Sequence, residues 1–253
     1  MLASERHQQI LRLLDERGSL RTVDLAQEFS VTDETVRRDL QLLADGHHLT
    51  RTHGGATCLN GRPKLQSFAE RRGIRVEQKS AIAKAALSLI EPGRTYAFDS
   101  STTSFELVRS LPDLSYRVVT NAYAVIDHLI RLDHVELIST GGRYHQKTQT
   151  FVGSDSVSAL RRFNINTAFV SCVGLDAKRG ASEAFEEQAG FKQVLVDMAD
   201  DVVLLADSRK LGKCSEYFFG ETRCFSRVIT DLAADVGILD QLRDCGCEVI
   251  IAE

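Results

Sequence analysis

The stretch from Thr32 to Leu40 combines a hydroxyl that can cap a helix with two adjacent arginines. Its apolar residues recur three and four positions apart, which predicts a helix with one face buried in a core. The polar residues left on the other faces are Thr32, Asp33, Glu34, Thr35, Arg37 and Arg38. Such a helix is suited to enter the major groove of DNA. An ordinary surface helix with solvated charges has the same pattern.

A second set of informative residues follows short apolar runs in the later part of the chain. The hydroxyl-rich stretch Asp99, Ser100, Ser101, Thr102 and Thr103 lies where a strand pattern gives way to a helix pattern. Free amides and the helix dipole favour an anion there, although a hydroxyl-rich helix cap is the simpler alternative. Comparable positions hold Thr120, Asn121, Gly141, Gly142, Arg143, Lys147, Asp207 and Lys210. If these runs form one parallel sheet, its carboxyl edge is predicted to bind a phosphorylated, hydroxylated small molecule.

Residues 1–57 are predicted to form a winged helix-turn-helix that carries the Thr32 helix. A first helix with an apolar stripe ends near Gly18, and a second short helix places Val23, Leu25, Ala26 and Phe29 inward. The third helix ends near Asp45 and Gly46, and a β-hairpin with glycines at its end follows. Arg51, Thr52 and His53 of this wing are expected along the DNA backbone or minor groove.

Residues 58–80 are interpreted as a basic linker, because breakers flank them and no apolar period runs through them. Six Lys or Arg and two Glu lie between Arg62 and Lys79. The cations are either a solvated connector or partners of an anion bound by the next domain.

Residues 81–253 alternate between amphipathic helices and short apolar strands, which predicts a largely parallel α/β sheet covered on both faces. The expected strands are Thr95–Asp99, Arg117–Thr120, Val135–Thr140, Ala168–Cys172, Asp201–Asp207, Arg227–Thr230 and Glu248–Ala252. The expected helices are Ala81–Ile90, Thr102–Leu111, Ala122–Arg131, Ser156–Arg162 and Glu186–Met198.

Length and composition agree with a two-domain cytoplasmic protein. The chain has 253 residues and a net charge of −4, so any DNA contact must rest on a local basic surface. Its six cysteines show no zinc-ligand spacing, which argues against a metal and for reduced thiols. No apolar run approaches the length of a membrane span, and the polar N-terminus does not have the pattern of a signal peptide.

The N-terminal part resembles the DeoR/GlpR-type bacterial transcriptional regulators. The resemblance is carried by Arg6-x3-Ile10-x3-Leu14 and by Thr32-x2-Thr35-Val36-Arg37-Arg38-Asp39-Leu40. It implies that residues 32–38 supply the recognition helix. Our assignment places Asp33, Glu34 and Arg37 on base edges and Thr35 and Arg38 on phosphates. Asp39 would repel a phosphate, so we expect it to pair with an arginine of the same domain such as Arg6.

The C-terminal part resembles the effector domain of the same family, which is similar in fold to ribose-phosphate isomerase. The matching motifs are Asp99-Ser100-Ser101-Thr102-Thr103, Val119-Thr120-Asn121, Gly141-Gly142, Gly174-Leu175-Asp176 and Ala206-Asp207-Ser208-x-Lys210-Leu211-Gly212. The resemblance implies a sugar-phosphate effector contacted by Asp207, Lys210 and Lys79, with Arg71 and Lys79 relaying its presence. Among family branches, the fucose type looks nearest. Ser101 departs from the glycine usual at its position, which narrows the expected phosphate loop.

A sugar-phosphate isomerase with an accessory head is the alternative function. Its base would be Glu183, Glu186 or Glu187, with Lys210 or Lys147 as the cation. The isomerases carry a D-G-A-D carboxylate pair, whereas residues 171–176 keep at most one acid. We therefore expect Glu183 to line an effector site in a non-enzymatic regulator without a cofactor. A repressor released by its effector is the default expectation, and a head with one recognition helix requires at least a homodimer.

Overall fold

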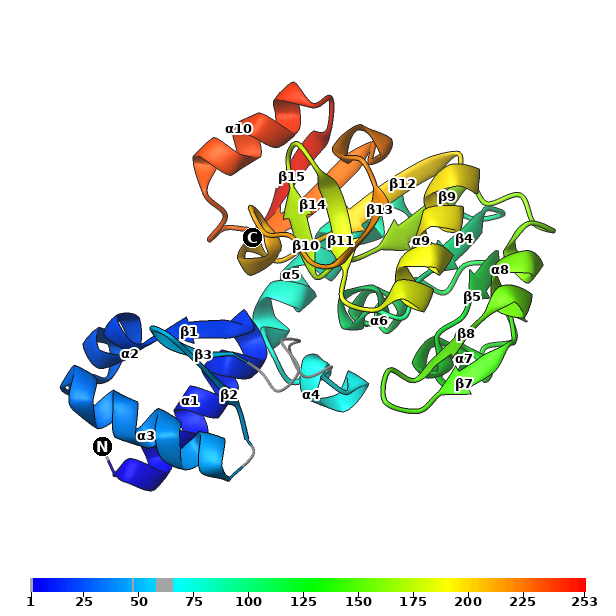
Figure 1. The fold of residues 1–253 in the computed structure, drawn as a ribbon. Coiled ribbons are helices and arrows are strands. Elements are labelled where there is room, and N and C mark those ends of the chain that lie inside the picture. The colour runs from blue at the N-terminus through cyan, green and yellow to red at the C-terminus, as the bar shows by residue number, and fades with distance from the viewer. Residues whose placement is uncertain (1, 47, 58–65) are drawn as a thin grey trace. The chain divides into compact units, whose positions relative to one another are not determined.

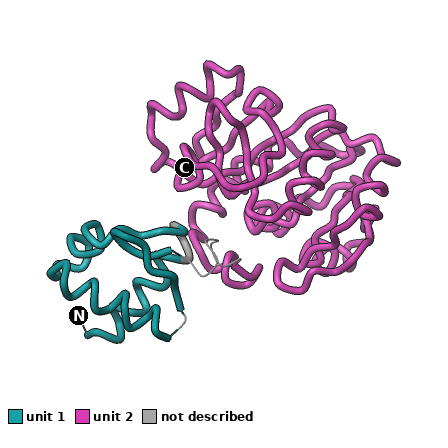
Figure 2. The backbone as a smooth tube through the Cα atoms, in the orientation of Figure 1, with its two compact units in different colours: residues 1–65 teal, residues 66–253 magenta. Residues whose placement is uncertain are grey.

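The computed structural model describes residues 2–46, 48–57 and 66–253, apart from the side chains of residues 15–17. The chain divides into two compact units, residues 1–65 and residues 66–253 (Figure 2). Each unit has a hydrophobic core of its own, and the two are described separately below.

The first unit contains three helices and a small antiparallel sheet (Figure 1). The helices are α1 (Ala3–Arg17), α2 (Thr22–Phe29) and α3 (Asp33–Asp45). The strands β1 (Ser19–Arg21), β2 (Thr50–Thr52) and β3 (Gly55–Thr57) pair in the order β1-β3-β2. The predicted winged helix-turn-helix is confirmed, and β1 adds a strand to the wing that the sequence pattern did not indicate.

Local chemistry explains the close turns of this unit. Ser30 adopts the left-handed conformation between α2 and α3, and Gly55 lies against β1. A Cβ on Gly55 would stand 1.8 Å from the backbone oxygen of Leu20, so only glycine permits this strand pairing. The expectation that Val23 points inward is wrong, because the buried face of α2 consists of Thr22, Leu25 and Ala26.

The second unit begins earlier than the sequence analysis predicts. Residues 58–65 of the predicted linker lie outside the described residues, but residues 66–80 are largely helical and belong to this unit. They contain α4 (Phe68–Arg72) and the start of α5 (Val76–Ala86). Ser67 and Glu70 form a capping box at α4, and the Phe68 side chain is buried in the core. The many charged residues of this segment led the sequence analysis to predict a linker, although the capping box and the buried Phe68 side chain hold it in the second unit.

The main sheet has seven strands, and each pair of neighbours is parallel. Its spatial order is β15-β14-β12-β9-β4-β5-β6. The strands are β4 (Thr95–Phe98), β5 (Tyr116–Thr120), β6 (Val135–Ser139), β9 (Thr167–Val170), β12 (Asp201–Leu205), β14 (Arg227–Asp231) and β15 (Glu248–Ala252). All seven predicted strands are present, and the polar residues Asp99 and Asp207 lie just beyond the ends of β4 and β12 rather than within them.

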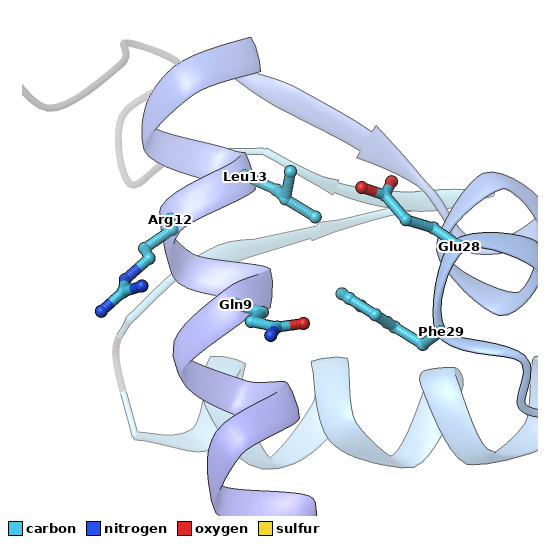
Figure 3. A pocket seen from close by; sticks show the side chains of 5 residues that line it. All are labelled: Gln9, Arg12, Leu13, Glu28 and Phe29. Atoms are coloured by element: carbon cyan, nitrogen blue, oxygen red, sulfur yellow. The ribbon is translucent and has the colours of Figure 1, made fainter. Parts of the chain in front are cut away.

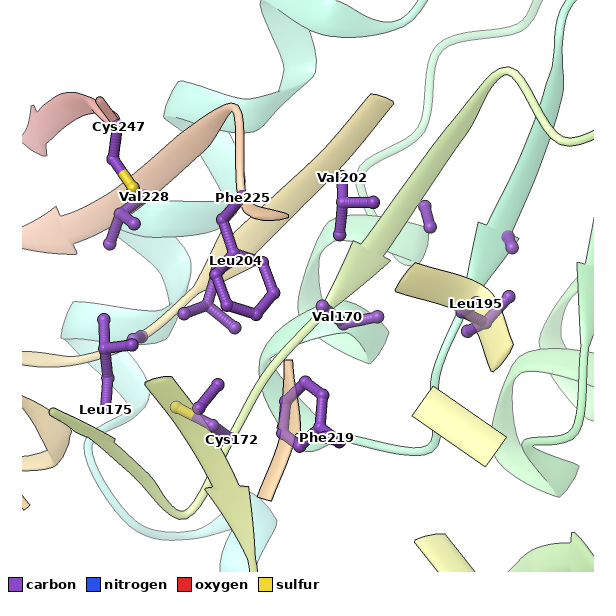
Figure 4. Packing of buried hydrophobic residues seen from close by; sticks show 14 of the residues in the cluster. Val170, Cys172, Leu175, Leu195, Val202, Leu204, Phe219, Phe225, Val228 and Cys247 are labelled. Carbon is purple, nitrogen blue, oxygen red and sulfur yellow. The ribbon is translucent and has the colours of Figure 1, made fainter. Parts of the chain in front are cut away.

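Helices cover both faces of this sheet. Along the central strands, neighbouring residues alternate between the two cores, so that Ala97 packs on one side while Tyr96 and Phe98 pack on the other. The helices α5, α6 (Thr102–Val108) and α7 (Tyr123–Leu129) cover one face. The helices α8 (Ser154–Leu160), α9 (Glu186–Met198) and α10 (Val236–Asp244) cover the other, whose packing is shown in Figure 4.

Several smaller elements were not predicted, because runs of three or four residues carry little periodic signal. The strands β10 (Gly174–Asp176), β11 (Gly180–Glu183) and β13 (Tyr217–Gly220) form an antiparallel sheet. The strands β7 (Arg143–His145) and β8 (Thr150–Val152) form a hairpin. Short 3-10 turns are η2 (Leu87–Leu89), η3 (Ser208–Lys210) and η4 (Thr222–Cys224). Helix α10 begins at a cap provided by Asp235.

Candidate nucleic-acid interface and candidate effector site

Helix α3 presents the polar face that the sequence predicts. Thr32 caps it, since its Oγ1 accepts a hydrogen bond from the Thr35 amide at 3.2 Å. Val36 and Leu40 are completely buried on the opposite face. The residues Thr32, Asp33, Glu34, Arg37 and Arg38 are exposed, and Thr35 is half-exposed. Glu34 and Arg38 lie 3.5 Å apart as an exposed pair one turn apart, which leaves both free to exchange partners with water or a ligand.

Asp39 anchors α3 to α1, as predicted. Its carboxylate accepts from the Arg6 guanidinium at 2.5 and 3.0 Å and contacts the His7 ring at 2.8 Å. Burial alone would raise the pKa of Asp39, but hydrogen bonds from Arg6 and His7 lower it below its ordinary value. The charged pair therefore fixes the orientation of α3 on α1.

The wing gives its predicted residues different surroundings. Thr52 and His53 are exposed, whereas the half-buried Arg51 donates to the backbone oxygen of Gly55 at 2.9 Å. Part of the Arg51 guanidinium therefore braces the hairpin. A surface pocket of the same unit is lined by Gln9, Arg12, Leu13, Glu28 and Phe29 (Figure 3). None of these five residues belongs to α3 or to the wing, so this pocket is separate from the predicted DNA face.

In the second unit, a buried lysine that the sequence analysis missed organises the carboxyl ends of β4 and β9. Lys192 of α9 lies 2.9 Å from Asp99, forms an ion pair with Glu183, and donates to the Ser171 carbonyl at 2.6 Å. Burial would lower the pKa of Lys192, but the two carboxylates raise it above its ordinary value. The available signal was its place on the buried face of α9, four residues after Gln188 and three before Leu195.

This lysine changes the interpretation of the two predicted acids. The pKa of Asp99, which burial would raise, is lowered by the charge of Lys192, so the carboxylate stays ionised. The Asp99 oxygens also accept the amides of Ser101 and Ser171 at 3.1 and 2.9 Å. Asp99 and Glu183 therefore share one ammonium inside the protein, which holds the Glu183 carboxylate in an ion pair.

Some of the predicted hydroxyl groups form hydrogen bonds within the protein, and others have no such partner among the described residues. Ser101 caps α6 through the Ser104 amide at 3.1 Å, which is the simpler alternative considered for this stretch. Thr120 donates to the Phe98 carbonyl at 2.7 Å across two strands, and Ser100 accepts from Gln188 at 3.3 Å. By contrast, the buried hydroxyl of Thr103 has no hydrogen-bond partner among the described residues. Thr102 is likewise buried at the start of α6.

Asn121, Gly141, Gly142, Arg143 and Lys147 lie along β5, β6 and the β7–β8 hairpin. The amide nitrogen of Asn121 donates to Phe151 at 3.1 Å, while its buried oxygen has no partner within the described part of the chain. Arg143 is exposed and pairs with Glu187 at 2.6 Å, so that glutamate is also occupied. Lys147 contributes its backbone carbonyl to the Phe68 amide at 2.9 Å. A Cβ on Gly142 would stand 2.7 Å from the Val152 oxygen, so this glycine serves packing.

The cations at the other end of this cluster have distinct roles. The Nε and one Nη of Arg71 are buried and have no hydrogen-bond partner among the residues described. Burial lowers the pKa of Arg71, while the charges of Glu183 and Asp99 act in the opposite direction. Lys210 donates to the Ser171 hydroxyl at 2.8 Å and lies 3.9 Å from Asp207. Arg71 and Lys210 are therefore the two cations best placed for an anionic ligand.

Lys79, which the sequence predicts to be a direct ligand, makes two hydrogen bonds within the protein. Its ammonium donates to the carbonyls of Arg71 and Ile74 at 2.5 and 2.6 Å, which closes the bend between α4 and α5. Burial, followed by the nearby charge of Lys210, lowers the pKa of Lys79 to about 8. The side chain therefore fixes the segment that carries Arg71.

Arg75 is a further residue of this bend that sequence reasoning missed. It adopts a left-handed conformation at the start of α5 and donates to Ser208 at 2.8 Å and to Asp231 at 3.2 Å. Its Nε lies 3.8 Å from Asp207. Arg75 thus connects the bend to the ends of β12 and β14, next to Lys210.

The geometry defines a class of protein: a DNA-binding head joined to a parallel α/β domain whose strand ends gather cationic side chains. Residues 6–62 match the DeoR-like helix-turn-helix domain, and residues 74–232 match the DeoR C terminal sensor domain. The chain belongs to the DeoR family of transcriptional regulators.

Similar proteins span nearly the whole chain. YulB, an HTH-type transcriptional regulator of Bacillus subtilis, is 35% identical over 96% of this chain and 95% of its own. An L-fucose operon activator of Haemophilus influenzae is 34% identical over 83% and 84%. A lactose phosphotransferase system repressor of Staphylococcus epidermidis is 32% identical over 90% and 91%. These relatives are regulators, so the prediction of a regulator rather than an enzyme is confirmed.

A solved D-ribose-5-phosphate isomerase in complex with phospho-erythronic acid has 17% identity and a TM-score of 0.39, and covers 53% of each chain. A likeness this remote carries no conclusion about activity. Among the described residues, no helix combines the length and apolar character that crossing a membrane requires.

Proposed function

We propose that this regulator represses a carbohydrate-use operon and that a phosphorylated sugar bound by the second unit controls it. The observation that carries the effector proposal is Arg71, whose buried guanidinium nitrogens have no partner among the described residues. A buried donor without an acceptor is costly, and a phosphate supplies several acceptors with charge. Lys210 lies in the same charged surroundings, because both cations lower the pKa of Lys79.

The proposed ligand spans the ends of several strands. Its phosphate pairs with Arg71 and Lys210. Its hydroxyls form hydrogen bonds with Asp207 and with the side-chain oxygens of Thr103 and Asn121 that have no partner among the described residues. Lys79, Asp99 and Glu183 act indirectly, because each is already bonded within the protein. The effector requires no further cofactor in this proposal.

On the DNA side, α3 enters the major groove. Asp33, Glu34 and Arg37 read base edges, while Thr35 and Arg38 contact phosphates. The exposure of Arg37 and Arg38 at the start of α3 supports this arrangement. Thr52, His53 and the remaining donors of Arg51 follow the backbone or minor groove beside it.

Control of DNA binding follows from linkage. If the effector lowers DNA affinity tenfold, it must favour the non-binding state by about 1.4 kcal/mol. Repression relieved by the effector is the proposed sign, and activation uses the same parts with the opposite preference. Because one head carries one recognition helix, we propose a homo-oligomer of at least two chains on two half-sites, acting in the cytoplasm.

A thermal-shift screen of the full-length protein against a panel of sugar phosphates tests the effector proposal. A ligand at 100 times its Kd adds about 2.7 kcal/mol, which corresponds to roughly 5–10 °C for a unit of this size. Lys210→Ala should abolish the shift. Lys213→Ala, which removes an exposed lysine three residues away, should preserve it. No shift with any sugar phosphate, or an equal shift in Lys210→Ala, would contradict the proposed site.

A further inference from the structure

One aromatic side chain holds a short segment, residues 66–74, on the second unit. The segment contains α4, whose five residues are too few to form a stable helix without support from the rest of the fold. Of residues 66–74 only Phe68 is buried, and its ring lies 5.6 Å from the ring of Phe105. The Phe68 amide also donates to the Lys147 carbonyl at 2.9 Å. We call residues 66–74 the α4 strap.

The strap joins the rest of the second unit at Arg75, which is fixed more firmly. Arg75 donates to the Ser208 hydroxyl at 2.8 Å and to the Asp231 carboxylate at 3.2 Å. Its backbone has a left-handed φ of 55°, which turns the chain into α5. Because α5 contributes its own buried residues to the core, among them Ile82 and Ala86, the strap can separate up to Arg75 while α5 stays in place.

The buried guanidinium of Arg71 opposes docking of the strap. Its Nε and one Nη are buried and have no hydrogen-bond partner among the described residues. Such donors lose their hydrogen bonds to water on docking and gain none in return. Burial lowers the pKa of Arg71 in spite of the opposing charges of Glu183 and Asp99, and both of these acids also pair with Lys192. Arg71 therefore makes the docked position less stable than the Phe68 contacts alone would make it.

The buried ammonium of Lys79 adds a like charge at the same place. It donates to the carbonyls of Arg71 and Ile74, so it lies directly against the strap. Burial and then the charge of Lys210 lower the pKa of Lys79, and the charge of Arg71 acts in the same direction, whereas Asp207 opposes them. Docking of the strap thus brings a third cation next to two others, and like charges at close range repel one another.

We infer that the α4 strap docks on the second unit when a phosphate-bearing ligand binds Arg71 and Lys210, and separates from it when that site is empty. The inference rests on the proposed function, because this ligand is the proposed effector. A phosphate supplies the acceptors that the buried nitrogens of Arg71 require, and its negative charge offsets that of the three cations. Because the complete site exists only in the docked position, ligand binding shifts the strap toward that position.

The strap also determines where the second unit begins. With the strap docked, the connection between the two units ends at residue 66, whereas with the strap separated it extends to Arg75. The length of a connection sets the effective concentration at which linked modules reach their binding sites. Occupation of the effector site can therefore alter DNA binding without any contact between the ligand and the head.

Hydrogen–deuterium exchange of the full-length protein, read for peptides covering residues 66–74, measures docking of the strap. Inorganic phosphate is the probe, and chloride at the same ionic strength is the control. Phosphate should raise the protection of the wild-type strap roughly tenfold, because it removes the penalty of the unpaired Arg71 donors. Peptides from β9 and β12 should exchange equally in both buffers, which separates docking of the strap from stabilisation of the whole unit.

Two arginine variants test the sign of the effect in chloride alone. Arg71→Met removes the buried cation, so its strap should be roughly tenfold better protected than the wild type and should respond little to phosphate. Arg72→Met is the matched control, since Arg72 is the exposed neighbour whose guanidinium lies 5.3 Å from the centre of the Phe105 ring. It removes the same charge from the same helix, but it should lower protection and keep the response to phosphate.

The possible results separate the strap from the proposed function. A wild-type strap that is equally protected in chloride and in phosphate, or an Arg71→Met strap that is less protected than the wild type, would overturn the inference. If these two results appear while sugar phosphates still shift the melting temperature, the effector stands and the strap does not. If the strap responds to phosphate but no sugar phosphate shifts the melting temperature, the strap stands and the sugar does not.

Discussion

Replacing Asp39 by Ala should release the recognition helix from the head. The side chains of Arg6 and Asp39 are only 9% and 6% exposed, so the substitution leaves a nearly buried guanidinium without its counter-charge. Breaking such a pair lowers the free energy of unfolding by about 3–5 kcal/mol. We use the lower value, about 3 kcal/mol, because His7, which also contacts Asp39, is partly exposed to water. A head of this size has a total stability of only about 3–8 kcal/mol. The first unit of the variant should therefore unfold transiently more often than the wild type, or remain unfolded.

Hydrogen–deuterium exchange of the full-length protein, read peptide by peptide, measures this loss in the head alone. A cost of about 3 kcal/mol lowers protection in α1 and α3 roughly 100-fold, while the second unit keeps its wild-type exchange. Asp45→Ala, which removes an exposed carboxylate on the same helix, should change protection less than about threefold. Replacing both partners by apolar residues, Arg6→Met with Asp39→Leu, should restore most of the protection.

The same pair sets a pH dependence for the head. The pKa of Asp39 is lower in the folded than in the unfolded protein, so its stabilisation is present above about pH 4 and is lost as the pH falls through the folded pKa. Unchanged protection in Asp39→Ala at neutral pH would refute the view that this carboxylate fixes α3. So would a head whose acid sensitivity is the same with and without Asp39.

Four further predictions concern single residues. Lys192→Met should lower the melting temperature of the second unit by roughly 6–20 °C, because it leaves two buried carboxylates unpaired. Calorimetry should show this loss and no change in the control, Lys213→Met. The pKa of Lys79 is about 8 in the folded protein and higher in the unfolded protein. The wild type should therefore gain stability relative to Lys79→Met as the pH rises from about 8 to about 10. Melting temperatures of the two proteins that change equally with pH would contradict this prediction. Arg37→Ala should weaken DNA binding and relax specificity at one base step, whereas Arg38→Ala should weaken all sequences alike, as competition binding with substituted duplexes can measure. Gly55→Ala should disrupt β1–β3 pairing and remove exchange protection from the wing, since its Cβ would overlap the Leu20 carbonyl.

The sequence was most informative where one pattern implied one environment. The 3–4 spacing of Val36 and Leu40 indicated the buried face of α3, and the unsuitability of Asp39 for a phosphate indicated its pairing with Arg6. The central strands β4, β9 and β12 were recognisable because both faces of the sheet are covered there and their residues are mostly apolar. At these positions the residue type favoured by the local helix or strand is also the residue type favoured by its environment in the fold.

The remaining features depend on contacts that residue spacing does not reveal. Lys192 lies among apolar residues of α9, but only the fold brings Asp99, just beyond β4, and Glu183, at the end of β11, next to its ammonium. The charge-rich segment from Arg71 to Lys79 resembles a linker until Phe68 is known to be buried and Lys79 to bond two carbonyls. These contacts stabilise buried charges through residues that are distant in the sequence, so the periodicity of apolar residues cannot predict them.

We propose that binding of a phosphorylated sugar at the effector site changes DNA binding by α3. The most direct test is the binding isotherm of the full-length protein on a duplex selected from a random pool. The isotherm is measured with and without the sugar phosphate that gives the largest thermal shift. We expect at least a tenfold change in Kd for the wild type and none for Lys210→Ala. An unchanged Kd in the wild type, or the same change in both proteins, would contradict it.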